Sequence, residues 1–230
     1  MLERLERSSA RQRSFVADAA HELRSPLTAI RTQLEVARAH PQHADWPQVS
    51  TDALADVERL SRLVDDLLVL ARLEDGAVPP VEAVDLAHVA DKIVARTVAD
   101  VSLRREGDDE VIVRADVDAV QRVVANLVDN AVRYAATTVT VDVRDGVGGG
   151  AVVSVADDGP GIPAEQRDHV FERFTRLDHA RSRDAGGAGL GLAIVRELVR
   201  SQGGEVSLED NAPGLRAVVR LPETPTRGDG

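Results

Sequence analysis

The sequence predicts a multidomain protein in which an all-α helical hairpin is followed by an α+β sandwich. Three observations support this: coiled-coil spacing of apolar residues near the N-terminus, a cluster of turn-forming residues at 74–80, and mixed helix and strand patterns beyond it. With 230 residues, the chain has room for one full domain and a smaller one. We expect a first domain at 1–75, a linker at 76–82, a second domain at 83–225 and a tail at 226–230.

The first domain carries two apolar stripes in which steps of four and three residues alternate. Between them, residues 40–47 contain two prolines, which predicts a break between two long helices. One hairpin buries only half of such a stripe, so we expect a homodimer in which two hairpins form a four-helix bundle. The alternative is one helical pair covered by the second domain. The stripes consist of Val16, Ala20, Leu23, Leu27, Ile30, Leu34 and Ala37, then Val57, Leu60, Val64, Leu67 and Ala71.

The second domain shows grouped helix and strand patterns. We expect helices at 86–99, 117–135, 164–171 and 190–202, and strands at 111–113, 139–143, 152–155 and 215–221. Residues 145–150 hold four glycines and predict a hairpin loop. Together these patterns are typical of one sheet faced by helices.

Composition excludes several kinds of partner and site. The formal net charge of -11 disfavours a phosphate backbone, so we expect no nucleic acid partner. The chain has no cysteine, which excludes disulfides, thiolate metal sites and thiol catalysis. No apolar run approaches the roughly 18 residues of a membrane-spanning helix, so we expect no direct membrane contact within these residues.

His21 is the first candidate for chemistry. If Ala20 and Leu23 occupy the a and d positions of the first stripe, His21 falls at b and faces water. A neutral imidazole is nucleophilic near physiological pH, and the adjacent Glu22 can orient the ring or take its second proton. Pro26 predicts a kink about one turn after His21. An exposed histidine beside a glutamate is also ordinary helix surface, so the pair alone identifies no site.

Asn126, Asn130, Arg133 and Tyr134 lie within about two turns of one predicted helix. Amide oxygens suit a Mg²⁺ ion that keeps phosphate and water ligands, and Arg133 can supply countercharge to phosphate. The polar face of a surface helix is the alternative interpretation.

The string Asp157-Asp-Gly159-Pro-Gly161 follows a predicted strand. Its glycines let the backbone approach a ligand closely, and a carboxylate at a strand end can accept a hydrogen bond from an adenine amino group. As an isolated signal, the string is equally consistent with a tight turn.

Two further strings complete the predicted pocket. In Phe171-Glu-Arg173-Phe174, the two aromatic residues have helical spacing and are expected in the core, while the polar segment 178–185 is a candidate lid. Glycines at 186–191 precede an apolar helix, whose free backbone N–H groups and dipole suit a polyphosphate. No strand precedes them in a βαβ unit, which excludes a dinucleotide fingerprint, and no GK[ST] triplet exists for a P-loop.

Taken together, these strings resemble sensor histidine kinases of bacterial two-component systems. FVADAAHELRSPLTAI resembles the phosphoacceptor box, and the four strings of the second domain resemble the N, G1, F and G2 boxes of a Bergerat-fold ATP-binding domain. The resemblance implies ATP and Mg²⁺, with Asn130 as metal ligand and Asp157 as adenine contact. It implies nucleotide binding by Asn126, Asn130, Arg133, Tyr134, Asp157, Gly159, Gly161, Arg173, Gly187, Gly189, Leu190 and Gly191.

The same resemblance implies an activity. It implies that His21 is phosphorylated from ATP, assisted by Glu22, and that the group passes to an aspartate of a response regulator. Ser25 stands where the family usually has Thr or Asn, at the position linked with dephosphorylating the partner, and Arg133 replaces a frequent lysine. We expect a cytoplasmic chain that is the cytoplasmic portion of a membrane-anchored sensor. The alternatives are a plain ATPase or serine kinase, for which His21 is incidental, and a non-catalytic dimeric adaptor.

Overall fold

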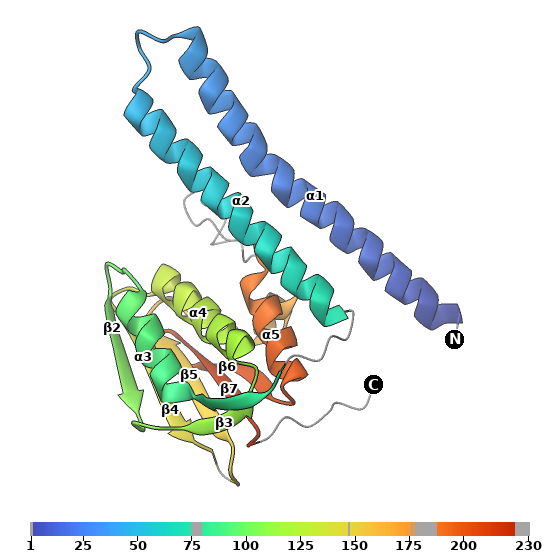
Figure 1. The fold of residues 1–230 in the computed structure, drawn as a ribbon, viewed down its shortest axis with the longest axis vertical. Helices are drawn as coiled ribbons and strands as arrows, with labels where there is room; N and C mark the ends of the chain where they lie inside the picture. The colour runs from blue at the N-terminus through green and yellow to red at the C-terminus, as the bar shows by residue number, and fades with distance from the viewer. Residues whose placement is uncertain (1, 75–79, 147, 176, 178–187, 224–230) are drawn as a thin grey trace. The chain divides into compact units, whose positions relative to one another are not determined.

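The protein consists of two compact units, residues 1–71 and 72–230. Its structure is a computed structural model that describes residues 2–74, 80–146, 148–175, 177 and 188–223, with side chains in the first helix described from Ala17 onward. Figure 1 shows a helical hairpin as the first unit and a sheet with helices as the second, as the sequence predicts.

The hairpin consists of α1 (Leu2–Ala39) and α2 (Trp46–Glu74). The predicted break is confirmed, although Pro47 lies in the first turn of α2, where proline is tolerated. Asp45 caps this helix: its Oδ1 accepts a hydrogen bond from Gln48 N at 3.2 Å, and its carbonyl accepts one from Val49 N at 2.9 Å. Helix α1 continues through Pro26 as a single assigned helix.

Burial divides the apolar residues of the hairpin between two neighbouring stripes. Ala19, Pro26 and Ala37 are buried on α1, whereas Leu27 is 59% exposed. This agrees with the expectation that one hairpin buries only half of each predicted stripe. The predicted members that are buried or half-buried are Leu23, Ile30, Ala37, Leu60 and Leu67. The predicted members that are exposed are Ala20, Leu27, Leu34, Val57, Val64 and Ala71. His21 is exposed on α1, in agreement with the water-facing position expected for it.

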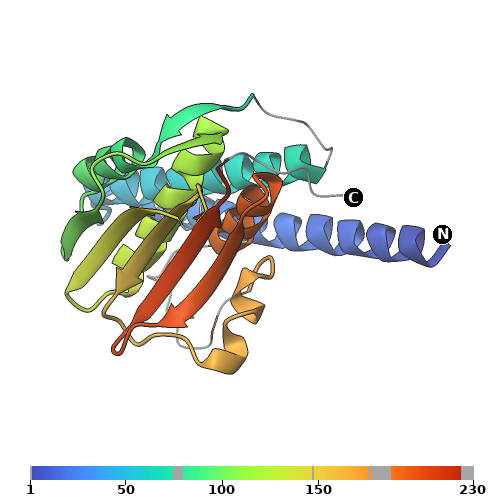
Figure 2. The same ribbon diagram turned by 90° about the horizontal axis from the view of Figure 1, so that it is seen from below.

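The second unit is built on a five-stranded sheet in the order β2-β4-β5-β7-β6. Strand β2 pairs parallel with β4, and the other neighbours are antiparallel. Figure 2 shows one face of this sheet, with helices on the opposite face. The strands are β2 (Ser102–Gly107), β4 (Thr138–Asp145), β5 (Ala151–Asp157), β6 (Glu205–Asp210) and β7 (Leu215–Leu221).

In the described part of this unit, three α-helices and a small second sheet accompany the main sheet. The helices are α3 (Leu86–Arg96), α4 (Val117–Tyr134) and α5 (Gly191–Ser201), and β1 (Glu82–Asp85) pairs antiparallel with β3 (Ile112–Ala115). Asp116 caps α4 by accepting hydrogen bonds from Asp118 N and Ala119 N. Helix α4 buries residues three and four apart, from Ala119 to Ala131, so its opposite face is free for polar side chains.

The structure corrects several predicted elements. The predicted helix 164–171 is two short 3₁₀ turns, η1 (Ala164–Gln166) and η2 (His169–Phe171). Strands β1, β2 and β6 were not predicted. Two of these, β2 and β6, are the edges of the main sheet, and their polar sequences lack the apolar runs that mark the central strands. The loop between β4 and β5 is the predicted glycine-rich hairpin connection, with residue 147 outside the described residues.

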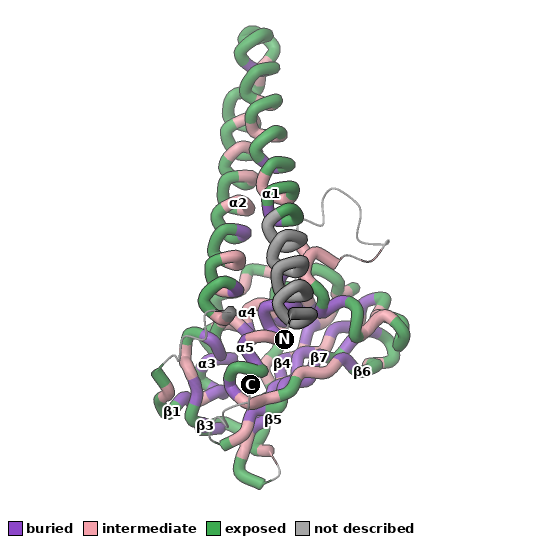
Figure 3. Tube along the Cα trace, turned by 90° about the vertical axis from the view of Figure 1, so that its right-hand side faces the viewer, coloured by how far each residue is buried: buried purple, intermediate pink, exposed green. Residues whose placement is uncertain are grey.

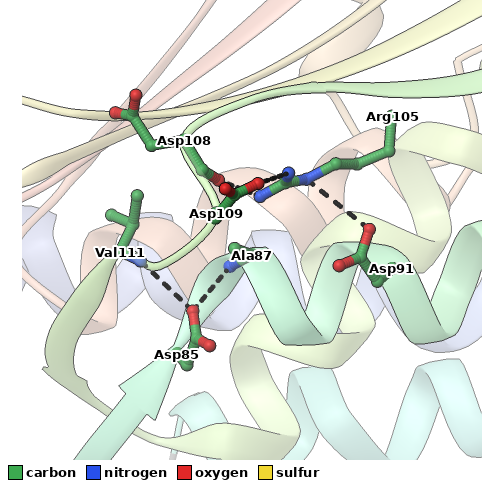
Figure 4. A network of polar contacts seen from close by, with 7 residues as sticks. All are labelled: Asp85, Ala87, Asp91, Arg105, Asp108, Asp109 and Val111. Carbon is green, nitrogen blue, oxygen red and sulfur yellow. Dashed lines mark hydrogen bonds and ion pairs between the residues drawn. The ribbon is translucent and has the colours of Figure 1, made fainter.

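A polar network fixes the beginning of α3 to the segment between β2 and β3 (Figure 4). Asp85 Oδ1 accepts hydrogen bonds from Ala87 N at 3.0 Å and Val111 N at 3.2 Å, so it caps α3 and anchors the start of β3. Arg105 lies 3.6 Å from a carboxylate oxygen of Asp91 and 3.8 Å from one of Asp109. The network accounts for several polar side chains without invoking a ligand.

Candidate functional site

Helix α4 carries the first group of candidate residues. Asn126 and Asn130 are half-buried, whereas Arg133 and Tyr134 are exposed. The Nδ2 atom of Asn126 is buried and has no hydrogen-bond partner within the described residues. A Cβ added at Gly191 would lie 3.9 Å from Asn126 Oδ1, so this amide lies near the beginning of α5. A buried amide N–H group without a partner costs stability. Asn126 Nδ2 is therefore suited to donate a hydrogen bond to an acceptor atom of a ligand.

Asp157 is the last residue of β5 and is only 4% exposed. Its Oδ1 accepts a hydrogen bond from Gly159 N at 2.9 Å. Burial raises the pKa of Asp157, and backbone hydrogen bonds from Gly159 and Leu215 partly oppose this effect. Desolvation disfavours the charged form of a buried carboxylate, so ionisation of Asp157 destabilises the fold as the pH rises through its raised pKa. This cost is consistent with a binding role.

The neighbouring Asp158 lies in a different environment. Its carboxylate accepts backbone hydrogen bonds from Ala136, Thr137 and Thr138 at 2.9 to 3.2 Å, and another from the Thr137 hydroxyl. The hydroxyl bond and the backbone bonds hold the pKa of Asp158 well below its ordinary value. Asp158 thus connects the end of β5 to the turn between α4 and β4.

The turn between β6 and β7 contacts the same strand end. Asn211 Nδ2 donates a hydrogen bond to the Asp157 carbonyl at 2.8 Å, and Gly214 has a φ of 109°. A Cβ at Gly214 would lie 1.8 Å from that carbonyl oxygen, so only glycine fits. The sequence interpretation missed Asp158, Asn211 and Gly214. The string Asn-Ala-Pro-Gly marks a turn, but nothing in it indicates which segment it contacts.

The segment after η2 meets Gly189, which lies just before α5. Phe174 N donates a hydrogen bond to Gly189 O at 2.9 Å, and both residues have a positive φ, 61° and 72°. A Cβ at Gly189 would lie 2.8 Å from the Phe174 carbonyl carbon, so this approach requires glycine. Phe171 is buried as expected, with the Arg196 guanidinium 5.5 Å from its ring centre, whereas Phe174 is only half-buried.

Helix α5 begins at Gly191, and no side chain of the described residues caps its N-terminus. Leu190 is buried at 1% exposure and anchors the start of the helix. The first backbone N–H groups of an uncapped helix form an anion site. The structure therefore brings Asn126 close to Gly191 and Phe174 close to Gly189. The strand end beyond Asp157 approaches the end of α4, because a Cβ at Gly159 would lie 2.2 Å from Tyr134 O.

Other predicted site residues have less distinctive surroundings. Gly161 is half-buried with a φ of 68°, and Arg173 is half-buried. Gly187 and the candidate lid 178–185 lie outside the described residues. In the described part of the chain, no group of three or more His, Cys, Asp or Glu side chains could hold a metal ion.

His21 lies on the surface of α1, as predicted. Its side chain is exposed, as is that of Ser25 one turn later, while Glu22 is half-buried. Residues four apart share one face of a helix, so His21 and Ser25 form a single accessible surface. None of the described helices combines the length and the apolar character needed to cross a membrane.

Comparison with known proteins identifies both units. Residues 11–76 match the His Kinase A (phospho-acceptor) domain, and residues 115–225 match the histidine kinase-, DNA gyrase B- and HSP90-like ATPase family. The chain is 41% identical to the signal transduction histidine-protein kinase/phosphatase MprB of Mycolicibacterium smegmatis, over 93% of this chain and 45% of that protein. The chain spans about half the length of the curated relatives it matches.

Solved structures agree with this assignment. A mycobacterial sensor histidine kinase, MprB, matches at 32% identity over 64% of this chain and 99% of that chain, with a TM-score of 0.55. The histidine kinase ThkA, solved in complex with the response regulator protein TrrA, has the same fold, with a TM-score of 0.74 at 21% identity over 98% of this chain and 67% of that one. The fold and the two matched domains define a phosphoacceptor hairpin joined to an ATPase-type domain. The chain belongs to the sensor histidine kinase family.

Proposed function

We propose that this chain binds ATP, phosphorylates its own His21 and passes the phosphoryl group to an aspartate of a response regulator. The observation that carries the proposal is an exposed His21 in the same chain as a second unit that holds a buried carboxylate, Asp157, and a buried Asn126 Nδ2 without a hydrogen-bond partner in the described residues. The reaction class is inferred from the family. His21 is the proposed phosphoacceptor, and Asp157 and Asn126 are proposed to bind the nucleotide.

The nucleotide is held by the predicted residues of the second unit. Ionised Asp157 accepts a hydrogen bond from the adenine amino group, and the uncapped start of α5 with the Asn126 amide receives the phosphates. The residues fit Mg²⁺, because this ion uses few protein oxygens and keeps phosphate and water ligands, so Asn130 suffices without an acidic cluster. The remaining assigned contacts are Arg133, Tyr134, Gly159, Gly161, Arg173, Gly187, Gly189, Leu190 and Gly191.

The reaction is an in-line phosphoryl transfer. A lone pair on the His21 imidazole attacks the γ-phosphorus, the bond to the bridging oxygen breaks, and ADP leaves. Glu22 orients the ring and takes the proton from the ring nitrogen that does not attack. Such transfers depend mainly on positioning and charge neutralisation, so Arg133 and the N–H groups at the start of α5 carry the protein's share of catalysis. Bound Mg²⁺ supplies further charge neutralisation.

The hairpin is proposed to bind two protein partners, a second copy of this chain and a response regulator. Exposed apolar residues on both helices pair two chains into a homodimer, and the exposed surface around His21 and Ser25 receives the response regulator. Ser25 also supports dephosphorylation of that partner. In this proposal residues 1–75 form the phosphoacceptor domain, 76–82 the linker, 83–225 the catalytic domain and 226–230 a tail. The chain works in the cytoplasm as part of a membrane-anchored sensor.

Labelling with γ-³²P-ATP and Mg²⁺ tests the proposal. We expect the parent chain to acquire acid-labile, base-stable label, and the His21→Ala and Asn130→Ala variants to acquire none above background. His88→Ala, which changes an exposed histidine of α3, should label like the parent. Acid-stable label, or label that survives His21→Ala, would favour a serine kinase. Label at background in the parent, together with no stabilisation by millimolar ATP, would favour a non-catalytic adaptor.

A further inference from the structure

We propose that Asp158 is a positioning residue that holds the Asp157 carboxylate in its adenine-binding orientation. The inference rests on the proposed nucleotide-binding function of Asp157. Asp158 itself faces the protein's own backbone rather than a ligand, so its role is exerted through its neighbour.

The carboxylate of Asp158 is fully engaged by one short segment. Its Oδ1 accepts hydrogen bonds from Ala136 N at 2.9 Å, Thr137 N at 2.9 Å and Thr138 N at 3.0 Å. Its Oδ2 accepts from the Thr137 hydroxyl and, at 3.2 Å, from Thr137 N. Three successive N–H groups converging on one carboxylate fix both its position and its rotamer.

This anchor sets the distance between two parts of the predicted pocket. The anchored segment immediately follows α4, which carries Asn126, Asn130 and Tyr134. Asp158 immediately follows β5, which ends at Asp157. The approach is close, because a Cβ at Gly159 would lie 2.2 Å from Tyr134 O and 2.9 Å from Asp157 Oδ1. Releasing Asp158 therefore lets the adenine-binding carboxylate move relative to α4.

On its opposite side, the strand end is held at the backbone peptide of Asp157. Asn211 Nδ2 donates to the Asp157 carbonyl, and Gly214 packs against the same peptide. The Asp157 side chain is held by two backbone partners. Gly159 N donates a hydrogen bond to its Oδ1 at 2.9 Å, and Leu215 supplies the second backbone contact. Because Gly159 directly follows Asp158, loss of the Asp158 anchor also loosens this tether.

A merely structural carboxylate is available for comparison. Asp85 also accepts two backbone hydrogen bonds, from Ala87 N and Val111 N, and neither donor belongs to a candidate site residue (Figure 4). If Asp158 only stabilises the fold, then Asp158→Ala and Asp85→Ala should have the same kind of effect. If Asp158 positions Asp157, only Asp158→Ala should alter recognition of the adenine amino group.

Calorimetric titration with Mg²⁺ and two nucleotides separates these cases: ATP, and purine riboside triphosphate, which lacks the 6-amino group. We expect Asp158→Ala to weaken ATP binding about tenfold and to reduce the preference for ATP over the analogue by a similar factor, because a lost charge-assisted contact is worth about a factor of ten. Binding of the analogue should change little. Asp85→Ala should lower the Tm and leave the preference unchanged.

Asp158→Asn provides the rescue. The asparagine side chain keeps one carbonyl oxygen, which can accept the three backbone hydrogen bonds that Asp158 Oδ1 accepts in the parent chain. Most of the preference for ATP should therefore return. If Asp158→Ala does not fold, Thr137→Val decides instead, because it removes only the hydroxyl donor to Oδ2, and the preference for ATP should then fall about threefold.

An Asp158→Ala chain that keeps the parent's preference for ATP would overturn the inference, as would unchanged preference in Thr137→Val when the alanine variant is unfolded. Failure of the parent chain to bind ATP is a different result, since it rejects the proposed nucleotide-binding function itself. A parent that binds both nucleotides equally would remove the adenine role of Asp157, and with it the role inferred for Asp158.

Discussion

The hairpin and the second unit bury their apolar residues to very different extents (Figure 3). Among its described side chains, the hairpin leaves eight large apolar residues exposed: Leu27, Leu34, Val36, Trp46, Leu54, Val57, Val64 and Leu68. In the described part of the second unit the corresponding residues are Val98, Ile112 and Tyr134. The second unit therefore completes its own core, whereas the hairpin leaves apolar surface exposed, which the proposed homodimer would cover.

The same difference extends to buried polar groups. In the second unit, Gln202 is 4% exposed and its Oε1 accepts a hydrogen bond from Asp116 N at 3.0 Å, so it joins the end of α5 to the cap of α4. In the hairpin, Gln33 is half-buried and its buried Oε1 has no hydrogen-bond partner within the described residues. The Gln202 side chain is buried with its acceptor hydrogen-bonded, whereas the Gln33 acceptor has no partner within the described residues of a single chain.

The largest effect is expected in the core of the second unit. Ile194 on α5 is fully buried, so Ile194→Ala should lower the free energy of unfolding by about 2 to 5 kcal/mol through lost transfer energy and a residual cavity. Urea unfolding followed by circular dichroism measures the change. Val98→Ala removes a side chain that is 99% exposed and should cost less than about 0.5 kcal/mol. Equal costs for the two variants would contradict the assigned core.

A smaller effect, of a different kind, is expected in the hairpin. Val64 is 41% exposed on α2, and Val64→Asp places a charge on the surface proposed to pair two chains. Burying that charge should weaken self-association by about 2 to 3 kcal/mol, roughly a hundredfold, with the second unit still folded. Sedimentation equilibrium checks this. Arg62→Asp introduces the same side chain elsewhere on the exposed surface of α2 and should leave the association unchanged. A monomeric parent chain would rule out the homodimer.

The smallest changes in stability are expected when Gln202 and Gln33 are each replaced by leucine. Gln202→Leu leaves the N–H of Asp116 without its acceptor and should destabilise the second unit by about 1 to 3 kcal/mol. Gln33→Leu removes an unsatisfied buried acceptor, so the hairpin should be unchanged or more stable by up to about 1 kcal/mol. Thermal unfolding of both variants measures the difference. A large loss of stability in Gln33→Leu would mean that the acceptor has a partner in the assembled protein.

Elements with strong periodicity could be predicted from the sequence, and those at edges could not. Helix α4 was predicted within one residue at its C-terminus, and β7 at both ends, because their apolar residues repeat with a clear period. The edge strands β2 and β6 are polar, since they contact a neighbour on one side only, and were missed. The heptad pattern predicted two long helices correctly, together with a stripe that one hairpin only half buries.

The sequence by itself determined the order of the units, the exposure of His21 and the strings that identify the family, because these depend on local spacing and residue type. Tertiary structure alone decided what the two adjacent aspartates do. Asp157 is buried at a strand end with a raised pKa, whereas Asp158 accepts hydrogen bonds from a turn about 20 residues earlier in the chain, with its pKa lowered. Neighbours in sequence acquire opposite electrostatic character because burial and hydrogen-bond donors come from segments that only the fold brings together.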